Sequence, residues 1–425
     1  MNKKQVLRTL FALAAIALTS AGCSNQEMLP ETTGNSTEET NAIVTFQLGL
    51  PGGDEVNYNR AATTQDATES TFKTLIVYDF KSTNTTESVT STLAGIYKIN
   101  IKTTATNADT PAVGSGECAP SADGSGYNVK LSLRAKAGDY HQFVFVANDQ
   151  CTTYDDVAKI GTSTLGELLT SISDKEVSNG STPNTFLGVS DNTPVDQLTG
   201  EELAKAGLAM TGKSLVLTIN SDNSQNIVST PVLMTRLMAR IDVKNYIPTS
   251  RNFKLKSVKM ANAAPKSYLF ENWTGSIWND QKTFVTLEQN PYYKDGYKAY
   301  ANGTSNEAWV ASITSPEGRE GTWYKKVLYA YEYPATVVGT DTATPQLLVE
   351  YVLNGSLYTQ TVNMVKTITG KPTERFNITR NHVYTLQIGD TGTPGGEVQF
   401  TFQINNWTSH EIDADLNGGE DVKTI

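Results

Sequence analysis

The stretch that decides the fold reads NAIVTFQLGLPGGDEVNYNRAA and spans Asn41–Ala62. Its first half alternates strictly, with one polar residue or glycine between successive apolar ones: Val44, Phe46, Leu48 and Leu50. A period of two places these four side chains on one face of a β-strand. Pro51-Gly52-Gly53 then ends the strand. The pattern predicts a strand with one buried face, which we call the plug strand.

A polar segment follows the plug strand and contains one basic residue, Arg60, before the small residues Ala61 and Ala62. Arg60 is the only basic residue between Cys23 and Lys73. Loops of small and polar residues are preferred sites of proteolysis. We therefore predict that a trypsin-like protease cleaves the Arg60–Ala61 bond. The alternative is an ordinary solvated arginine in a linker.

A second stretch, Glu397–Asn406 (EVQFTFQINN), repeats the alternation near the C-terminus. Its apolar residues match the plug strand position by position: Val398, Phe400, Phe402 and Ile404. A groove that accepts one strand fits the other, so we predict a donor strand that replaces a neighbour's plug strand after cleavage. The alternative is a permanent core strand, with Ser409–Leu416 as donor. Both candidates lie within 397–416.

Composition narrows the classes of function. The 425 residues suffice for two or three domains. A net charge of −10 and a pI near 5.0, with no block of Lys and Arg, argue against nucleic acid as a partner. Three His and three Cys show no metal or nucleophile motif, and Asp413 and Asp415 stand without the rest of a calcium loop. We expect no enzyme, no cofactor and no metal site.

The N-terminus has the pattern of a targeting segment. Lys3, Lys4 and Arg8 precede a short apolar run, and Ser20-Ala21-Gly22-Cys23 resembles a bacterial lipobox. We predict a signal peptide over 1–22 and lipidation, including palmitate, at Cys23. The alternative is an ordinary secretory signal cut near Gly22. Residues 23–60 then form a lipidated propeptide that carries the plug strand.

The rest of the chain is rich in short alternating or apolar segments separated by turn residues, which predicts an all-β fold. We expect two β-sandwich domains, 61–245 and 246–425, with short helical insertions. Capping boxes at Thr164 and Thr199 predict two of these helices. Asn354-Gly355 predicts one β-hairpin. A second hairpin is expected between Tyr127–Leu133 and Gln142–Ala147, which flank a turn at 137–139.

Cys118 and Cys151 are candidates for a disulfide in an oxidising exterior. The second predicted hairpin places Cys151 opposite residues 122–124, several positions from Cys118. The long loop before that hairpin would have to close the gap, so the sequence leaves both states open.

The order and spacing of several motifs resemble the fimbrillins, the subunits of protease-assembled (type V) pili of Gram-negative gut and oral bacteria. The motifs are Thr235–Val243 (TRLMARIDV), Tyr268–Asn272 (YLFEN), Arg380–Tyr384 (RNHVY) and Trp407. The lipobox cysteine and its spacing to Arg60 match as well. The likeness covers nearly the whole chain.

This resemblance implies two transthyretin-like β-sandwich domains, exported as a lipoprotein to the outer membrane and cell surface. It implies that a protease removes the N-terminal strand, and that the opened groove accepts a C-terminal strand of the next subunit in a fimbrium. The implied partners are other fimbrillin subunits, the protease and a host or bacterial surface receptor, and the implied role is cell adhesion. The alternative is a non-polymerising surface lipoprotein: a tip or anchor fimbrillin, or a glycan-binding adhesin.

Overall fold

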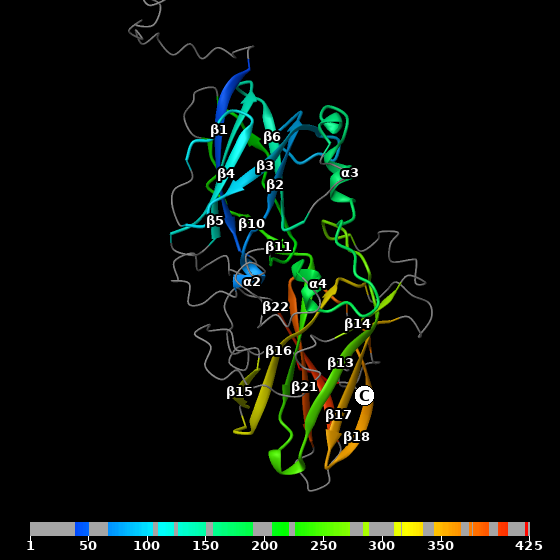
Figure 1. Cartoon of the computed structure of the whole chain (residues 1–425). Helices are drawn as coiled ribbons and strands as arrows, with labels where there is room; N and C mark the ends of the chain where they lie inside the picture. Colours follow the sequence, from blue (N-terminus) through cyan, green and yellow to red (C-terminus); the bar gives the residue numbers. More distant parts are fainter. Residues whose placement is uncertain are drawn as a thin grey trace, which may run out of the picture. The chain divides into compact units, whose positions relative to one another are not determined.

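The computed structural model describes residues 39–50, 67–104, 109–122, 126–149, 156–189, 206–220, 226–272, 284–288, 310–315, 317–334, 344–366, 374–375, 377–390, 398–406 and 421–423 (Figure 1). Strands dominate these residues and the α-helices among them reach at most five residues, so the predicted all-β class is confirmed. In the same part of the chain, no helix has the length and apolar character needed to cross a membrane.

One sheet is built from the first half of the chain, in the order β10-β1-β5-β4-β3-β2-β6-β7-β11, with β9 paired to β1 and β8 to β6. Its strands are β1 (Thr40–Gly49), β2 (Leu75–Ser82), β3 (Thr92–Ile101), β4 (Ser115–Pro120), β5 (Gly126–Ala135), β6 (Tyr140–Ala147), β7 (Met210–Lys213), β8 (Leu217–Thr218), β9 (Asn226–Ile227), β10 (Val232–Leu233) and β11 (Thr235–Arg236). Phe46 of β1 contacts Phe143 and Phe145 of β6, although four strands separate them in this order. The sheet therefore folds over on itself and encloses a core.

Two further sheets come from the second half, in the orders β15-β16-β12-β21-β22-β23 and β14-β13-β17-β18. Their strands, with the separate β19–β20 pair, are β12 (Met238–Asn245), β13 (Lys254–Ala263), β14 (Val285–Glu288), β15 (Val310–Thr314), β16 (Glu320–Tyr331), β17 (Gln346–Leu353), β18 (Ser356–Asn363), β19 (Val365–Lys366), β20 (Glu374–Arg375), β21 (His382–Asp390), β22 (Val398–Asn406) and β23 (Asp421–Lys423). Tyr351 of one sheet lies 6.1 Å from Phe400 of the other, measured between ring centroids. These sheets face each other as a sandwich.

The boundary predicted after residue 245 needs a correction. β12 pairs with β16 and β21, so its residues belong to the later sheets. A division between two sandwiches therefore falls before Met238. Its position could not be read from the sequence because Thr235–Asn245 is one continuous segment that contributes strands to both groups of sheets. The division into two domains stays a prediction.

Strands β2 and β6 are buried on both faces. On β6, Phe143 and Phe145 belong to the core that also holds β1, whereas Val144 and Val146 belong to a second core that extends into the later sheets. A strand covered on both sides gains from apolar residues at every position. This explains why the segments LIVYDF and QFVFVA show almost no polar alternation.

The predicted hairpin between β5 and β6 is wrong. β5 pairs with β1 and β4, whereas β6 pairs with β2, β7 and β8. The turn at Gly138 (φ +83°) joins the two strands, but each enters a different layer because both have to bury apolar residues against other strands. The argument that placed Cys151 opposite residues 122–124 fails with this hairpin.

Two local predictions are confirmed. Thr164 accepts a hydrogen bond from the Glu167 amide and Glu167 accepts one from the Thr164 amide, so a capping box begins α3 (Leu165–Leu169). Asn354 (φ +49°) and Gly355 (φ +84°) form the two-residue turn between β17 and β18. The helix predicted at Thr199 lies outside the described residues. The remaining helical elements are α2 (Ala67–Ser70), α4 (Pro183–Leu187), η1 (Val157–Lys159) and η3 (Thr249–Arg251).

Candidate functional site: the β1 groove

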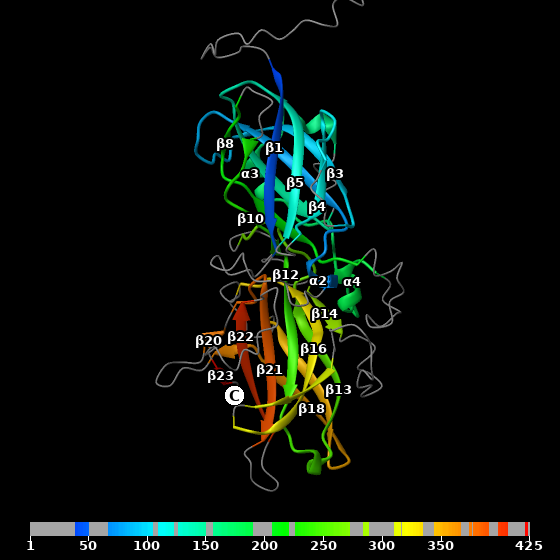
Figure 2. The same cartoon turned by 90° about the vertical axis from the view of Figure 1, so that its left-hand side faces the viewer.

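The predicted plug strand is β1. It pairs antiparallel with β5 over ten consecutive positions, from Thr40↔Ala135 to Gly49↔Gly126, without a register shift. Figure 2 shows β1, in dark blue, running along β5. An unbroken ladder of this length fixes the register, because a slip by one residue would turn the apolar face of β1 away from the core.

The apolar face of β1 is fully enclosed. Val44, Phe46 and Leu48 have no exposed surface and Leu50 is 4% exposed, as the alternation predicted. The Phe46 ring packs edge-on against two rings of β6, with centroid distances of 5.0 Å to Phe143 and 5.1 Å to Phe145. Burying four such side chains contributes roughly 6–12 kcal/mol as an upper bound. Loss of β1 would therefore open a groove floored by aromatic rings.

Gly126 lets the β1 backbone approach β5 closely. A Cβ atom on Gly126 would lie 1.9 Å from the carbonyl oxygen of Leu48, a distance that no packed structure tolerates. The close contact joins two main chains, so a flexible side chain cannot move aside. Glycine at this position is a requirement of the groove, and the glycine at the start of a strand pattern was the only sequence signal for it.

The second edge of β1 is held less completely than the first. Short parallel ladders join Val44 and Thr45 to β9, and Leu48 and Gly49 to β10. The Val228 amide also donates to the Thr45 carbonyl (2.9 Å), and the Met234 amide donates to the Gly49 carbonyl (3.1 Å). β1 thus lies in a two-sided slot, with β5 as the continuous wall and residues 226–234 as the interrupted one. The sequence does not reveal this wall, because β9 and β10 have only two residues each and show no periodicity.

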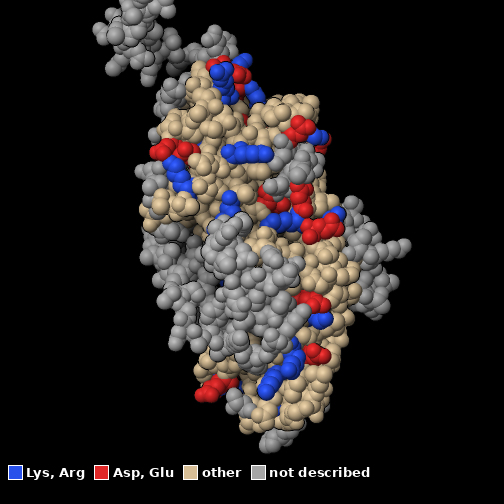
Figure 3. Space-filling model, viewed as in Figure 1, with Lys and Arg blue, Asp and Glu red and all other residues tan. Residues whose placement is uncertain are grey.

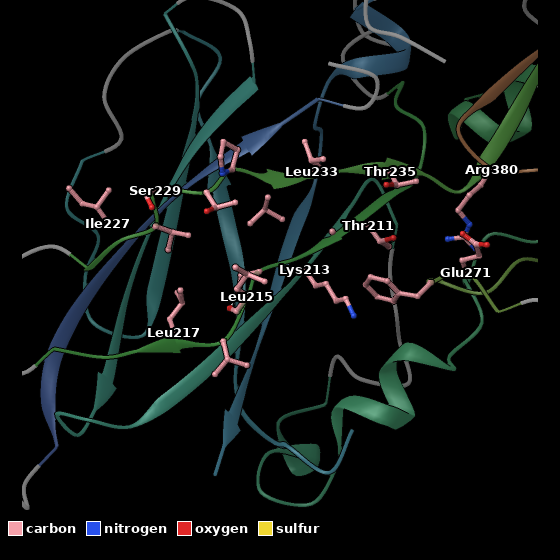
Figure 4. A pocket seen from close by; sticks show the side chains of 18 residues that line it. Thr211, Lys213, Leu215, Leu217, Ile227, Ser229, Leu233, Thr235, Glu271 and Arg380 are labelled. Atoms are coloured by element: carbon pink, nitrogen blue, oxygen red, sulfur yellow. Dashed lines mark hydrogen bonds between the residues drawn. The ribbon is translucent and has the colours of Figure 1, made fainter. Parts of the chain in front are cut away.

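A cavity of about 620 Å³ lies on the other side of the interrupted wall. Its lining comes from residues 211–217 and 227–235, with Glu271 and Arg380 at one end (Figure 4). Leu215, Ile227 and Leu233 line it and are 69%, 66% and 42% exposed. The strand pairing that the structure describes for residues 226–233 is with β1.

The chain re-enters described structure at α2, where Glu69 is held by buried charges. Arg240 Nη1 donates to Glu69 Oε2 (3.0 Å), and the Tyr329 hydroxyl donates to Glu69 Oε1 (2.6 Å). Arg236 Nε donates to the Glu69 carbonyl (3.0 Å), and Arg240 Nη2 donates to Asp242 (3.0 Å). These contacts fix the chain nine positions after Arg60. A cut at Arg60 would leave everything from α2 onward anchored.

Burial dominates the protonation of this cluster. It raises the pKa of the Glu69 carboxyl above its usual value, against the opposing effect of the Arg240 and Arg236 guanidiniums. Burial also lowers the pKa of Arg236 to about 10. Both groups are almost fully enclosed, so removing either one would cost the other a compensating charge in a buried site.

Two of the sequence motifs that carry the resemblance, Tyr268–Asn272 and Arg380–Tyr384, meet at Arg380, and a third, Thr235–Val243, contacts the neighbouring Asn381. The Arg380 guanidinium donates to the carbonyls of Leu269 (2.9 Å) and Tyr268 (2.8 Å) and to the Glu332 carboxylate (2.7 Å). Arg236 donates to the side chain of Asn381 (3.1 Å). These motifs therefore have a structural role: they hold together the segment around β11, residues 268–269 and the start of β21.

The predicted donor residues lie within a strand of their own sheet. β22 pairs with β21 over nine positions, from His382↔Asn406 to Asp390↔Val398, and with β23 on its other edge. Phe402 has no exposed surface, Phe400 is 9% exposed, and Val398 and Ile404 pack against the same core. This is the arrangement of a permanent core strand, the alternative considered above, and it directs the donor prediction to Ser409–Leu416, which lies outside the described residues.

Several predicted site residues also lie outside the described residues: Cys23, Arg60, Ala61 and Cys151. Cys118 is buried on β4, and burial raises the pKa of its thiol to about 12. Its pairing with Cys151 stays a prediction. Among the described residues, no group of three or more His, Cys, Asp and Glu side chains is arranged to hold a metal ion. The charged side chains visible in Figure 3 are interspersed in sign.

No protein-family model matches the sequence, and neither does any curated protein. Solved structures similar to this chain include the tip fimbrial protein Mfa3 of Porphyromonas gingivalis, crystallised with a C-terminal truncation (TM-score 0.48, 12% identity, 87% of this chain and 100% of that one). Others are a fimbrial assembly protein of Parabacteroides distasonis (0.41, 12%, 91% and 98%) and the P. gingivalis fimbrial anchor protein Mfa2 (0.33, 10%, 88% and 100%). All three TM-scores are below 0.5, so the function proposed next rests on this chain's own strands.

Proposed function

We propose that this protein is a structural subunit of a fimbrium that polymerises by strand replacement and supports cell adhesion at the bacterial surface. In this proposal it is exported as a lipoprotein through Cys23 to the outer membrane. An arginine-specific or trypsin-like protease cleaves after Arg60 and releases β1. A strand of the next subunit then enters the slot between β5 and residues 226–234.

The observation that carries the proposal is the position of β1 in the chain and in the core. β1 supplies Val44, Phe46, Leu48 and Leu50 to the enclosed core, yet it precedes every other described strand. One cut in the 51–66 segment would separate it from the body, which α2 holds through Glu69. Strand addition supplies main-chain hydrogen bonds for affinity and alternate side chains for register. A head-to-tail contact that does not close into a ring produces a filament.

Arg60→Ala tests the cleavage step, with Arg319→Ala, an exposed arginine elsewhere, as the matched control. N-terminal sequencing of the surface-assembled form of the parent and of the control should begin at Ala61. The Arg60→Ala chain should remain a folded, uncut monomer, since its slot stays filled by β1. Ordinary polymer from this variant would remove Arg60 from the mechanism. Incorporation of labelled fatty acid by the parent, but not by Cys23→Ala, tests the lipid anchor.

A second candidate is a tip or anchor subunit, or an adhesin, that accepts a strand without donating one. The interior position of β22 favours this candidate, because no alternating strand near the C-terminus is free among the described residues. Deletion of residues 407–425 from the cleaved protein separates the candidates. A stalk subunit should lose polymerisation with its donor, whereas a tip subunit should still cap filaments formed by other subunits. The receptor and the other subunits of such a filament are partners under either proposal.

A further inference from the structure

β18 is an eight-residue strand that ends the four-stranded sheet in the described part of the chain. It pairs with β17 in unbroken register from Leu353↔Ser356 to Gln346↔Asn363, so no bulge twists it away from a neighbour. Figure 1 shows the two strands side by side. The outer edge of β18 therefore presents a regular row of main-chain groups along its whole length.

Devices that normally block edge-to-edge pairing are missing from β18. Its sequence, SLYTQTVN, contains no charged residue and no proline. The other end strands of the two C-terminal sheets are shorter: β14 has four residues, β15 five and β23 three. Short edge strands are one way in which proteins limit pairing with other chains. Among these edges, β18 alone has the length and regularity of a docking strand.

Exposed apolar side chains accompany this open edge. Every residue of β18 except Val362 is exposed, with Leu357 at 62% and Tyr358 at 46%. Tyr358 stacks on Tyr351 at 5.4 Å, and Tyr351 stacks on Phe253 at 5.3 Å, measured between ring centroids. This aromatic row begins in the core and ends at the exposed ring of Tyr358. A strand laid beside β18 would cover that ring.

We infer that β18 pairs antiparallel with β18 of a second copy of this chain, which joins two four-stranded sheets into one. The sequence of β18 suits a second copy as the occupant. At a net charge of −10 two copies repel each other, and an uncharged contact strip adds no local repulsion to this. β18 is such a strip, and its self-pairing brings no like charges into opposition.

Symmetry restricts the register of this pairing. A two-fold axis normal to the joined sheet keeps the same face of both copies on the same side of that sheet. Since side chains alternate between the two faces along a strand, the numbers of two residues that oppose each other differ by an even number. With the axis at Gln360, Tyr358 of each copy lies opposite Val362 of the other, and Thr359 of each copy lies opposite Thr361 of the other. Aromatic–β-branched and Thr–Thr pairs are favourable neighbours across strands. Gln360 then faces Gln360 of the second copy.

This contact goes beyond the proposed strand replacement and needs neither cleavage nor β1. The experiment therefore uses the uncut Arg60→Ala chain, in which head-to-tail assembly is blocked. Analytical ultracentrifugation over a range of concentrations should show a reversible dimer. Gln360→Lys and Gln360→Glu, each alone, should weaken dimerisation about tenfold, since like charges then oppose each other across the axis. An equimolar mixture of the two variants should restore dimers.

The same charge changes at the exposed Val157 on η1, Val157→Lys and Val157→Glu, serve as controls and should leave the dimer unchanged. Gln360→Cys should form a disulfide between copies under mild oxidation, whereas Leu357→Cys should not. Three results would overturn the inference: a monomer at all concentrations, a dimer insensitive to both charges at position 360, or no recovery on mixing. Circular dichroism and thermal melting of each variant establish that the chain is folded before these outcomes are read.

Discussion

β1 and β22 share one pattern, an apolar residue at every second position, and each buries a phenylalanine that has no exposed surface. Phe46 of β1 and Phe402 of β22 lie in different cores. β22 is flanked in the chain by described strands, β21 before it and β23 after it, and it pairs with both. β1 precedes every other described strand.

This comparison shows that alternation specifies a half-buried strand but says nothing about whether the strand is replaceable. Position in the chain decides that property. Removing β22 would require two cuts and would strip β21 of one of its two strand partners, whereas one cut separates β1 from the rest of the chain. The following predictions test this difference, from the largest expected effect to the smallest.

The largest effect is expected from a carboxylate in each core. Phe46→Asp and Phe402→Asp both remove a fully buried ring and bury a charge, a change that costs more than about 4 kcal/mol. Phe402→Asp should unfold the C-terminal sheets, because β22 has no alternative position. Phe46→Asp should release β1 while the C-terminal sheets stay folded. Hydrogen exchange should show lost protection at 398–406 and 382–390 in the first variant, and at 40–49 and 126–135 in the second.

Limited trypsin digestion provides the control for this pair. If β1 is the replaceable strand, the Phe46→Asp body that remains after cleavage at Arg60 is chemically identical to the parent body. The two should then have the same exchange pattern and the same affinity for an added peptide spanning 41–50. Global unfolding by Phe46→Asp, with lost protection in β12 and β21, would show that β1 is as permanent as β22.

Much of the secondary structure was predictable from local chemistry. The turn at Asn354-Gly355 needs two positive φ angles and the capping box at Thr164 needs two reciprocal hydrogen bonds, and both occur as predicted. The pairing of β5 with β6 was not predictable from the turn between them. Each strand gains more by packing against distant strands than by joining its neighbour, and such partners leave no local signal.

The candidate site was likewise predictable only in part. The alternation of β1 identified the side chains that fill the groove, but not the wall at 226–234, because strands of two residues lack periodicity. The buried contacts around Arg240 were also hidden: Glu69, which accepts from Arg240, and Tyr329, which donates to Glu69, are distant in sequence and carry no motif of their own. The motif around Arg236 marked the position without revealing the charge network.

Glu69→Ala tests how firmly the chain that follows β1 is anchored to the rest of the protein. It removes the carboxylate that accepts from Arg240 and from the Tyr329 hydroxyl in a buried site, and it retains the Arg240–Asp242 contact. Loss of one partner of a buried ion pair costs about 3–5 kcal/mol. Because the Asp242 contact remains, we expect Glu69→Ala to lower the free energy of unfolding by about 3 kcal/mol. Urea unfolding measures it. Glu317→Ala, an exposed carboxylate, is the control and should change stability by less than about 0.5 kcal/mol.

Two glycines, one opposite β1 and one opposite β22, compare how closely each strand approaches its neighbour. Gly126 lies opposite Gly49 of β1, and Gly389 lies opposite Gln399 of β22. A Cβ at Gly126 meets the Leu48 carbonyl at 1.9 Å, whereas a Cβ at Gly389 meets nothing within 4 Å. Gly126→Ala should therefore cost about 1–3 kcal/mol and raise exchange in β1. Gly389→Ala should be neutral or stabilising by up to about 1 kcal/mol. Equal losses at both positions would contradict the close main-chain contact.

The smallest effect concerns one hydroxyl on each strand. Thr45 Oγ1 on β1 is buried without a hydrogen-bond partner, whereas Thr401 Oγ1 on β22 lies 3.5 Å from the side-chain oxygen of Gln387. Leaving a hydroxyl unpaired is unfavourable, so Thr45→Val should stabilise the uncut chain by up to about 1 kcal/mol, and valine suits a strand equally well. Thr401→Val should bring no such gain. Because the gain at Thr45 exists only while β1 fills its slot, it should vanish after cleavage at Arg60. Thermal melting before and after cleavage measures the difference, and a gain that survives removal of β1 would place its origin outside the groove.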